Sequence, residues 1–258
     1  MERVEASTLS PEGFWRRYAA QGRPVFVGGA TAGWGAALLE APSFLAAYGT
    51  TRWQPQMLLD GNATALAPYM RKRRRRPLLF NRPVDPAELE RLRREVAWPA
   101  AFTHPRVVAS GSAAGLDFFV GPNGSGLPMH YHGAVWNALV WGRKLWALRR
   151  PADAVFAPSR QHPLDSEWWR RRAEETGDGG ATLMCEQAAG EALFLPPQWA
   201  HATVSLEPSL SVGAFLQDAR ALGLHMQLLH APRGVGSLAN AAVLSHGWLE
   251  RVGRAFPA

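Results

Sequence analysis

The sequence predicts an all-β core flanked by helices, on the strength of three observations. From about Val107 to Phe215 the chain consists of short apolar runs separated by turn residues, a pattern typical of a sandwich or barrel. Helix-start signals precede this region, and helical spacing returns after Asp218. The 258 residues are 47% hydrophobic and 19% charged, so the chain can bury a core of its own.

The N-terminal part is expected to mix helices and strands. Ser10 before Pro11 is typical of a helix N-terminus, with the serine as N-cap and proline in the first helical position. The apolar run at 24–29 predicts a buried strand, and residues 44–48 predict a short helical segment.

A second helix is predicted after Asp85. The segment Asp85-Pro86-Ala87-Glu88 has the capping-box pattern, which satisfies the first backbone N–H groups of a helix. The predicted helix then carries one apolar stripe, with a Glu90/Arg94 pair on its outer face. The stripe consists of Leu89, Leu92 and Val96.

The core strands are predicted from their apolar runs and the turns between them. A glycine-rich turn at 121–126 separates the first two, and residues 166–176 are expected to form an inserted helix or loop. The runs are Leu116–Val120, Trp136–Trp141, Leu145–Leu148, Ala181–Met184, Ala192–Leu195, Ala202–Leu206 and Leu210–Phe215.

The C-terminal part is predicted to be helical. Leu222, Met226 and Leu229 have helical spacing, and a last helix is expected from Leu238 to Val252. Helices in this position are candidates for packing a second copy of the chain into a homodimer. We therefore expect one domain over 1–258, with N-terminal helices and strands at 1–106, a β core at 107–217 and C-terminal helices at 218–258.

The charge is concentrated in one segment. The net charge is +7, and the run from Arg71 to Arg76 accounts for six of these charges, so the rest of the chain is close to neutral. Such a run is either a solvated loop, a nuclear-localisation signal or a nucleic-acid patch. Nucleic acid therefore stays open as a partner through Arg71 to Arg76.

The compartment is judged from what the sequence lacks. A single cysteine, Cys185, excludes an intrachain disulfide, and the first residues contain no apolar segment of a signal peptide. No run of eighteen apolar residues is present. The expectation is a soluble intracellular protein, cytoplasmic or nuclear, that does not associate with a membrane.

Two histidines stand one residue apart at the start of a strand-like segment, 127–146. Side chains alternate faces along a strand, so His130 and His132 are expected to point the same way and Tyr131 the other way. With His201, which follows a Pro-Pro-x-Trp turn, they predict a shared metal site. The remaining histidines are taken as surface or core residues: His104, His162, His225, His230 and His246.

Three segments in this order resemble the JmjC and cupin-like family of double-stranded β-helix proteins. They are His130-Tyr131-His132, the segment from Trp136 to Lys144, and the segment from Gly190 to His201. The resemblance is tight over about 116–215 and looser toward the N-terminus. It implies a jelly-roll core of the double-stranded β-helix type.

The resemblance also implies a cofactor site. Family members bind Fe(II) through a His-x-Asp/Glu pair and a distal histidine, which His130 and His201 match. Lys144 matches the lysine that pairs with the far carboxylate of 2-oxoglutarate, and Asn137 matches a polar position that contacts this cosubstrate. The implied activity is hydroxylation of a protein substrate by an Fe(II)/2-oxoglutarate-dependent oxygenase.

His132 replaces the family's carboxylate, and this departure keeps several functions open. Three neutral imidazoles leave a bound divalent ion with its full charge, and such a site accepts iron or another divalent metal. The alternatives to a 2-oxoglutarate oxygenase are a non-catalytic scaffold that binds a protein partner and a three-histidine dioxygenase that does not use 2-oxoglutarate. Ser205 and Ser211 are further candidates for the same pocket, whereas Glu186 is left outside it.

Overall fold

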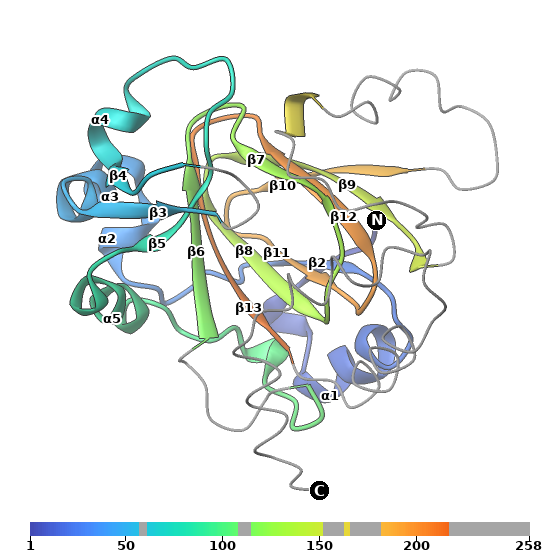
Figure 1. The fold of residues 1–258 in the computed structure, drawn as a ribbon. Helices are drawn as coiled ribbons and strands as arrows, with labels where there is room; N and C mark the ends of the chain where they lie inside the picture. Colours follow the sequence, from blue (N-terminus) through green and yellow to red (C-terminus); the bar gives the residue numbers. More distant parts are fainter. Residues whose placement is uncertain (57–60, 108–114, 152–162, 166–181, 217–258) are drawn as a thin grey trace, which may run out of the picture.

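The structure is a computed structural model that describes residues 1–56, 61–107, 115–151, 163–165 and 182–216 (Figure 1). Two β-sheets face each other and enclose a common interior, as in a jelly roll. The predicted all-β core of the jelly-roll, cupin-like type is confirmed. The strands from β6 onward surround His130, His132 and His201.

The larger sheet has nine strands, and strands from the N-terminal part extend it at both ends. Its order is β1-β2-β11-β8-β13-β6-β5-β3-β4. The bounds, in the same order, are Arg3–Glu5, Val25–Gly28, Ala192–Leu195, Val135–Trp141, Ser209–Phe215, Leu116–Gly121, Phe80–Pro83, Arg52–Pro55 and Thr64–Ala65. The N-terminal part thus shares a sheet with the core, while the division at residues 106 and 217 stays a prediction.

The smaller sheet is antiparallel and has four strands, in the order β10-β9-β12-β7. Its strands are Leu183–Ala188, Arg143–Arg149, Ala200–Ser205 and Gly126–His130. Two interruptions shape it. Only Gly142 separates β8 of the large sheet from β9 of the small sheet, and the β12–β7 register shifts between His201 and Thr203.

Short helices lie beside the outer strands β3, β4 and β5 and below the barrel (Figure 1). Two begin as the sequence predicted: the Ser10 hydroxyl accepts from the N–H of Gly13, and the Asp85 carboxylate accepts from the N–H of Ala87. Glu90, however, pairs with Arg93 instead of Arg94. The helices are α1 Pro11–Phe14, continued by a π-turn at Trp15–Ala19, α2 Ala36–Leu39, α3 Ala41–Tyr48, α4 Leu66–Met70 and α5 Pro86–Arg94, with 3-10 turns at Ala6–Thr8, Ala100–Phe102 and Pro163–Asp165.

The large sheet has a different partner on each face. Trp136, Ala138 and Val140 of β8 belong to the core that packs on the helices. The other face packs on the small sheet, because Leu193 and Leu195 of β11 contact a tryptophan and a leucine of β9. Burying such side chains contributes about 1.5–3 kcal/mol each, so this interface holds the two sheets together.

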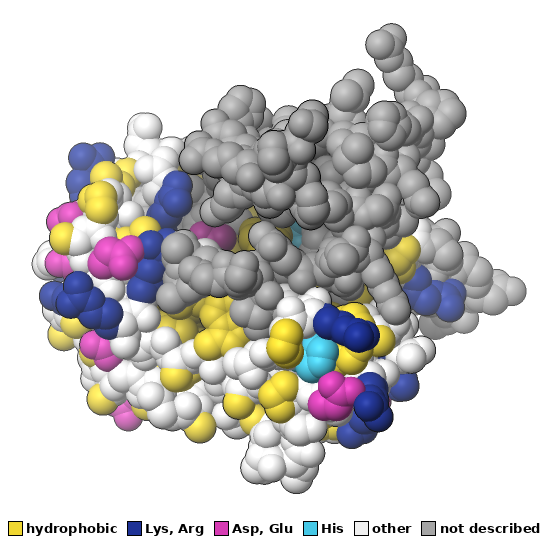
Figure 2. Space-filling view, turned by 90° about the horizontal axis from the view of Figure 1, so that it is seen from below, with side chains coloured by type: hydrophobic (Ala, Val, Ile, Leu, Met, Phe, Trp, Pro, Cys, Tyr) yellow, Lys and Arg dark blue, Asp and Glu magenta, His cyan; other side chains and the backbone are white. Residues whose placement is uncertain are grey.

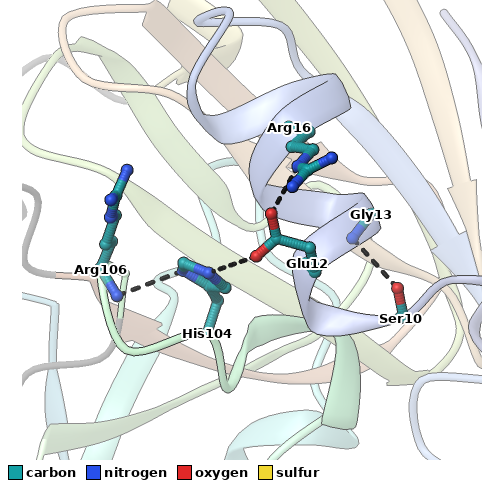
Figure 3. A network of polar contacts seen from close by, with 6 residues as sticks. All are labelled: Ser10, Glu12, Gly13, Arg16, His104 and Arg106. Atoms are coloured by element: carbon teal, nitrogen blue, oxygen red, sulfur yellow. Dashed lines mark hydrogen bonds and ion pairs between the residues drawn. The ribbon is translucent and has the colours of Figure 1, made fainter.

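His104 belongs to a structural network (Figure 3). Its Nδ1 accepts from the backbone N–H of Arg106 at 3.2 Å, so Nε2 carries the proton and donates to Glu12 at 2.9 Å. The ring also stacks on Trp15 at 5.3 Å. The hydrogen bond from the Arg16 guanidinium, and to a smaller extent the one from His104, lowers the pKa of Glu12. His104 therefore ties α1 to the chain ahead of the core strands.

The remaining predictions concern the core strands, the insertion and the C-terminal helices. Each predicted core run contains a strand, but β10 spans Leu183–Ala188 instead of Ala181–Met184, and β7 at Gly126–His130 was not predicted as a strand of its own. The predicted insertion at 166–176 and both C-terminal helices lie outside the described residues, and with them the expected dimer contact. In the part of the chain that the structure describes, no helix is long and apolar enough to cross a membrane.

Gly142 provides a test of how the two sheets are joined. Its φ is +89°, and an added Cβ would lie 2.3 Å from the carbonyl oxygen of Pro208. We expect Gly142→Ala to lower the free energy of unfolding by more than about 2 kcal/mol in urea denaturation, because a positive-φ cost adds to a backbone clash.

Gly22 is the matched control for this substitution. It has a φ of +62°, but nothing lies within 4 Å of an added Cβ. Gly22→Ala should therefore cost only about 1 kcal/mol. Equal losses for the two variants would contradict the close approach at Gly142.

Candidate metal centre

Two of the three histidines face each other across neighbouring strands. His130 is the last residue of β7, and its register partner on β12 is His201. Both side chains are buried, and their ring centroids are 4.2 Å apart. Ala202, next to His201, belongs to a cluster on the opposite face of the small sheet. Strand alternation therefore turns both rings toward the interior between the sheets.

His132 reaches the same place from outside the strand. The sequence placed both histidines at the start of a strand, and this was wrong: β7 ends at His130, and β8 begins only at Val135. The His132 ring nevertheless lies 4.6 Å from that of His201 and contacts Phe215 of β13 at 4.9 Å. Tyr131, which lies between His130 and His132 in the sequence, packs with the cluster that contains Ala202 on the other face of the small sheet. Tyr131 and the two histidines therefore point to opposite sides, as expected.

Backbone carbonyls fix the tautomer of all three rings. The Nδ1 atoms of His130, His132 and His201 lie 2.7, 2.7 and 2.9 Å from the carbonyl oxygens of Pro128, Gly133 and Trp199. Because a carbonyl only accepts, each Nδ1 carries the proton and donates. Each Nε2 is then left with a lone pair, which is the form that binds a metal.

Burial keeps these rings neutral. Desolvation lowers the pKa of His130 to about 4 and that of His132 to about 3, and it holds the pKa of His201 well below its usual value. At neutral pH no proton therefore competes for the nitrogen lone pairs. The cluster presents three uncharged donors to an ion.

The spacing of the donors suits one ion. One ligand atom from each histidine lies within 4.8 Å of the other two. Because 4.8 Å is the largest separation, an ion at the centre of such a triangle would be at most about 2.8 Å from each ligand atom, and the rings would close by no more than about 0.7 Å to reach ordinary metal–imidazole bonds. The three histidines could bind a metal, and neutral imidazoles suit zinc, copper, iron or nickel.

Lys144 lies deeper in the same interior. It is on β9, with Ser205 of β12 as its register partner, and the side chain is only 2% exposed. Its ammonium donates to the Ser211 hydroxyl and lies 5.9 Å from the ring centroid of Phe119. Desolvation lowers the lysine pKa to about 7. Within the described residues, no carboxylate pairs with this cation.

Asn137 is also buried, and its amide oxygen Oδ1 has no hydrogen-bond partner in the described part of the chain. Beside it, the indole N–H of Trp146 donates to Gln187 at 2.8 Å. The Gln187 amide in turn donates to the backbone carbonyls of Asn137 and Glu191, each at 2.8 Å. A buried acceptor without a donor costs about 1–3 kcal/mol, which a ligand or water could offset.

The remaining candidates, Ser211, Ser205 and Glu186, differ in the groups that they contact. Ser211 contacts Lys144, but the Ser205 hydroxyl is taken up by Ser125 and Ser209. Glu186 is exposed and pairs with Arg143, so it lies outside the site as expected. The sequence could not assign the two serines, since their orientation depends on the register of β12 and β13.

Asp117 is a residue of this interior that sequence reasoning missed. It precedes Phe118, which belongs to the core that packs on the helices. Asp117 therefore shares the inner face of β6 with Phe119, which contacts Leu127 of the small sheet. A charged residue inside the apolar run LDFFV was the signal that could have identified it.

Asp117 lies at the same end of the barrel as the histidines. Its register partner, Gly213, is two residues before Phe215, which contacts His132. Desolvation raises the pKa of Asp117, the charges of Arg82 and Arg93 lower it by less, and no direct hydrogen bond or ion pair of Asp117 is present among the described residues. Figure 2 views the molecule from this end and shows hydrophobic, acidic and histidine side chains near its centre.

Comparison with known proteins agrees with this fold. JmjC domain-containing protein 8 of Homo sapiens is 32% identical over 123 residues, 46% of each chain. Lysine-specific demethylase JMJ21 of Arabidopsis thaliana is 30% identical over 36% of this chain and 11% of its own. Bifunctional arginine demethylase and lysyl-hydroxylase psr-1 of Caenorhabditis elegans is 29% identical over 37% of this chain and 28% of its own.

These similarities agree with the predicted resemblance to JmjC domain proteins. No family model matches the chain. The match spans about half the length of the JmjC domain-containing protein 8 sequences. The relatives include JmjC demethylases and a hydroxylase, together with JmjC domain-containing protein 8 from Rattus norvegicus at 31% identity.

Metal binding by the cluster can be measured directly. Protein prepared without a histidine tag should bind about one divalent ion per chain, because three bare Nε2 atoms converge. His130→Ala and His201→Ala should each weaken binding at least about 10-fold in calorimetric titration with Zn²⁺ or Fe²⁺. His104→Ala is the control, because that ring is engaged elsewhere. Unchanged binding in both cluster variants would contradict the site.

Lys144 predicts a pH dependence of stability. Its pKa is about 7 in the folded chain and near its usual 10.5 when unfolded. Between these values the unfolded state binds the extra proton, so the free energy of unfolding rises with pH. We expect wild type to gain stability relative to Lys144→Met between pH 7 and 9.5 in urea titrations. A constant difference between the two proteins would show that the lysine pKa is not lowered.

Proposed function

We propose that this chain is an Fe(II)- and 2-oxoglutarate-dependent JmjC oxygenase that hydroxylates a protein side chain. The convergence of three bare histidine nitrogens above a buried lysine carries the proposal. His130, His132 and His201 would hold the metal, which supplies the one-electron and oxygen chemistry when bound. The protein provides ligands, orientation and an interior from which water is largely excluded.

Lys144 is suited to hold the far carboxylate of the cosubstrate. Ser205, the register partner of Lys144, lies four positions after His201 along β12, a distance of about 13 Å in a strand. The lysine side chain spans part of this distance, and the rest accommodates a short dicarboxylate between ammonium and metal. Ser211 orients the ammonium, and the Asn137 amide can donate to the same ligand.

Charge favours a dianion in this interior. Three neutral imidazoles remove none of the metal's charge, and Lys144 adds a further cation once an anion restores its proton. A bound dicarboxylate would offset both. His132 in place of a carboxylate should therefore strengthen the attraction for 2-oxoglutarate, even as it removes the anionic ligand that the resembled family uses.

A basic side chain is the substrate that we propose. Asp117 lies at the histidine end of the barrel with no direct hydrogen bond or ion pair among the described residues, and a lysine or arginine side chain would supply a donor closer than the charges of Arg82 and Arg93. The names of two relatives refer to lysine and arginine substrates, which agrees with this choice.

The main alternative is a JmjC-fold scaffold without turnover. His132 favours it, because the ligand set lacks the carboxylate of the resembled family. A dioxygenase that uses the three histidines without 2-oxoglutarate is the other alternative, and it differs by making Lys144 dispensable.

Turnover of 2-oxoglutarate tests the proposal. With Fe(II) and a pool of lysine- and arginine-containing peptides, wild type should release succinate. His201→Ala and Lys144→Ala should each reduce this release at least about 10-fold, because one removes a metal ligand and the other the carboxylate partner. The control His104→Ala should retain it.

The outcomes separate the three functions. Bound iron without succinate release from any peptide would overturn the oxygenase proposal. If the His132→Asp variant then gained turnover, the wild-type chain would be a scaffold whose JmjC pocket lacks only the carboxylate ligand. Oxygen consumption that persists in Lys144→Ala without 2-oxoglutarate would favour the three-histidine dioxygenase.

A further inference from the structure

The run from Arg71 to Arg76 forms a fully exposed basic loop between α4 and β5. Among the described residues, no ion pair involves Arg71, Lys72, Arg73 or Arg75. Neighbouring cations repel each other, so these four cations without an ion pair are favourable only where they serve solubility or meet an anion. The metal centre does not account for these charges.

Tyr69 holds the loop in a defined shape. Its hydroxyl accepts from the backbone N–H of Leu78, and its ring contacts that of Phe80 on β5 at 4.8 Å. The guanidinium carbon of Arg74 lies 4.2 Å from the centroid of the same ring. One largely buried tyrosine thus joins both ends of the loop and orients a cation at its centre.

The loop lies at the end of the barrel opposite the histidines. Pro77, directly after it, lies 3.3 Å from where a Cβ would stand at Gly124, in the turn that precedes β7. β7 then runs from Gly126 at this end to His130 at the metal centre. A partner bound to the loop would therefore leave the histidine end of the barrel open.

The charge density of the loop matches a nucleic-acid backbone. Six residues extend over at most about 20 Å, which is at least one cation per 3.3 Å. A nucleic-acid strand carries about one phosphate per 3.4 Å. A membrane surface is the weaker candidate, because none of the large hydrophobic side chains that are exposed in the described residues belongs to this loop.

We propose that the loop Arg71–Arg76 binds the phosphate backbone of nucleic acid. Binding depends little on base sequence, because the cations of the loop match the spacing of phosphates, which carry no sequence information, and the loop contains no aromatic side chain for base stacking. It is independent of the metal centre, so this proposal stands or falls apart from the oxygenase activity.

The test is fluorescence anisotropy with labelled 20-nucleotide RNA and duplex DNA. The variant Arg71→Gln/Lys72→Gln/Arg73→Gln/Arg75→Gln removes four cations but keeps Arg74 and its position over the tyrosine ring. The control Arg16→Gln/Arg17→Gln/Arg23→Gln/Arg94→Gln removes the same charge from exposed positions elsewhere.

At about 50 mM salt we expect the loop variant to weaken binding at least 10-fold more than the control. Its slope of log K against log[salt] should become shallower by about 0.7–0.9 for each phosphate that the variant no longer neutralises. Equal weakening in loop and control variants would reduce the effect to net charge and overturn the proposal. Absence of binding by wild type at 50 mM salt would also overturn it.

Vesicles of phosphatidylserine and phosphatidylcholine serve as the competing arm. Tighter binding of wild type to these vesicles than to RNA and DNA, abolished in the loop variant, would assign the loop to a membrane surface and overturn the nucleic-acid proposal.

Tyr69→Phe gives a second readout: removing the hydroxyl that accepts from Leu78 should weaken nucleic-acid binding while all six cations remain.

Discussion

The antiparallel register between β7 and β12 is the constraint on which the site depends. It sets His130 opposite His201, and the packing of β9 against β11 places both rings inside the barrel. A shift of one residue would turn either ring to the outer face of the small sheet. His132 needs no strand of its own, because its contact with Phe215 and its bond to the Gly133 carbonyl position it.

The interior of this barrel is poorly suited to stability alone. Among the described residues Lys144 is buried without a carboxylate partner and Asn137 keeps an unmatched oxygen, and burial lowers the pKa values of the three imidazoles. Apolar side chains in these positions would avoid the desolvation cost. A ligand that carries both a metal-binding group and a carboxylate would offset the cost of burying Lys144 and engage the three imidazoles through the metal, which links the fold to the proposed function.

Much of the fold could be predicted from the sequence, since apolar runs and helix caps are local signals. Strand β11 and the caps at Ser10 and Asp85 occur as predicted. The histidine cluster was indicated by spacing and resemblance. The end of β7 at His130, the Glu90–Arg93 pair and the inward position of Asp117 could not be predicted, because they depend on turn geometry, helix-end rotamers and sheet curvature.

The central claim is that backbone carbonyls hold three neutral imidazoles with their Nε2 atoms free for one metal. Long-range ¹H–¹⁵N correlation spectra of the metal-free protein at pH 7 test it most directly. The account predicts that His130, His132 and His201 all appear as neutral Nδ1–H tautomers, and that one equivalent of Zn²⁺ shifts their Nε2 resonances together. A protonated ring or an Nε2–H tautomer at any of the three would contradict it.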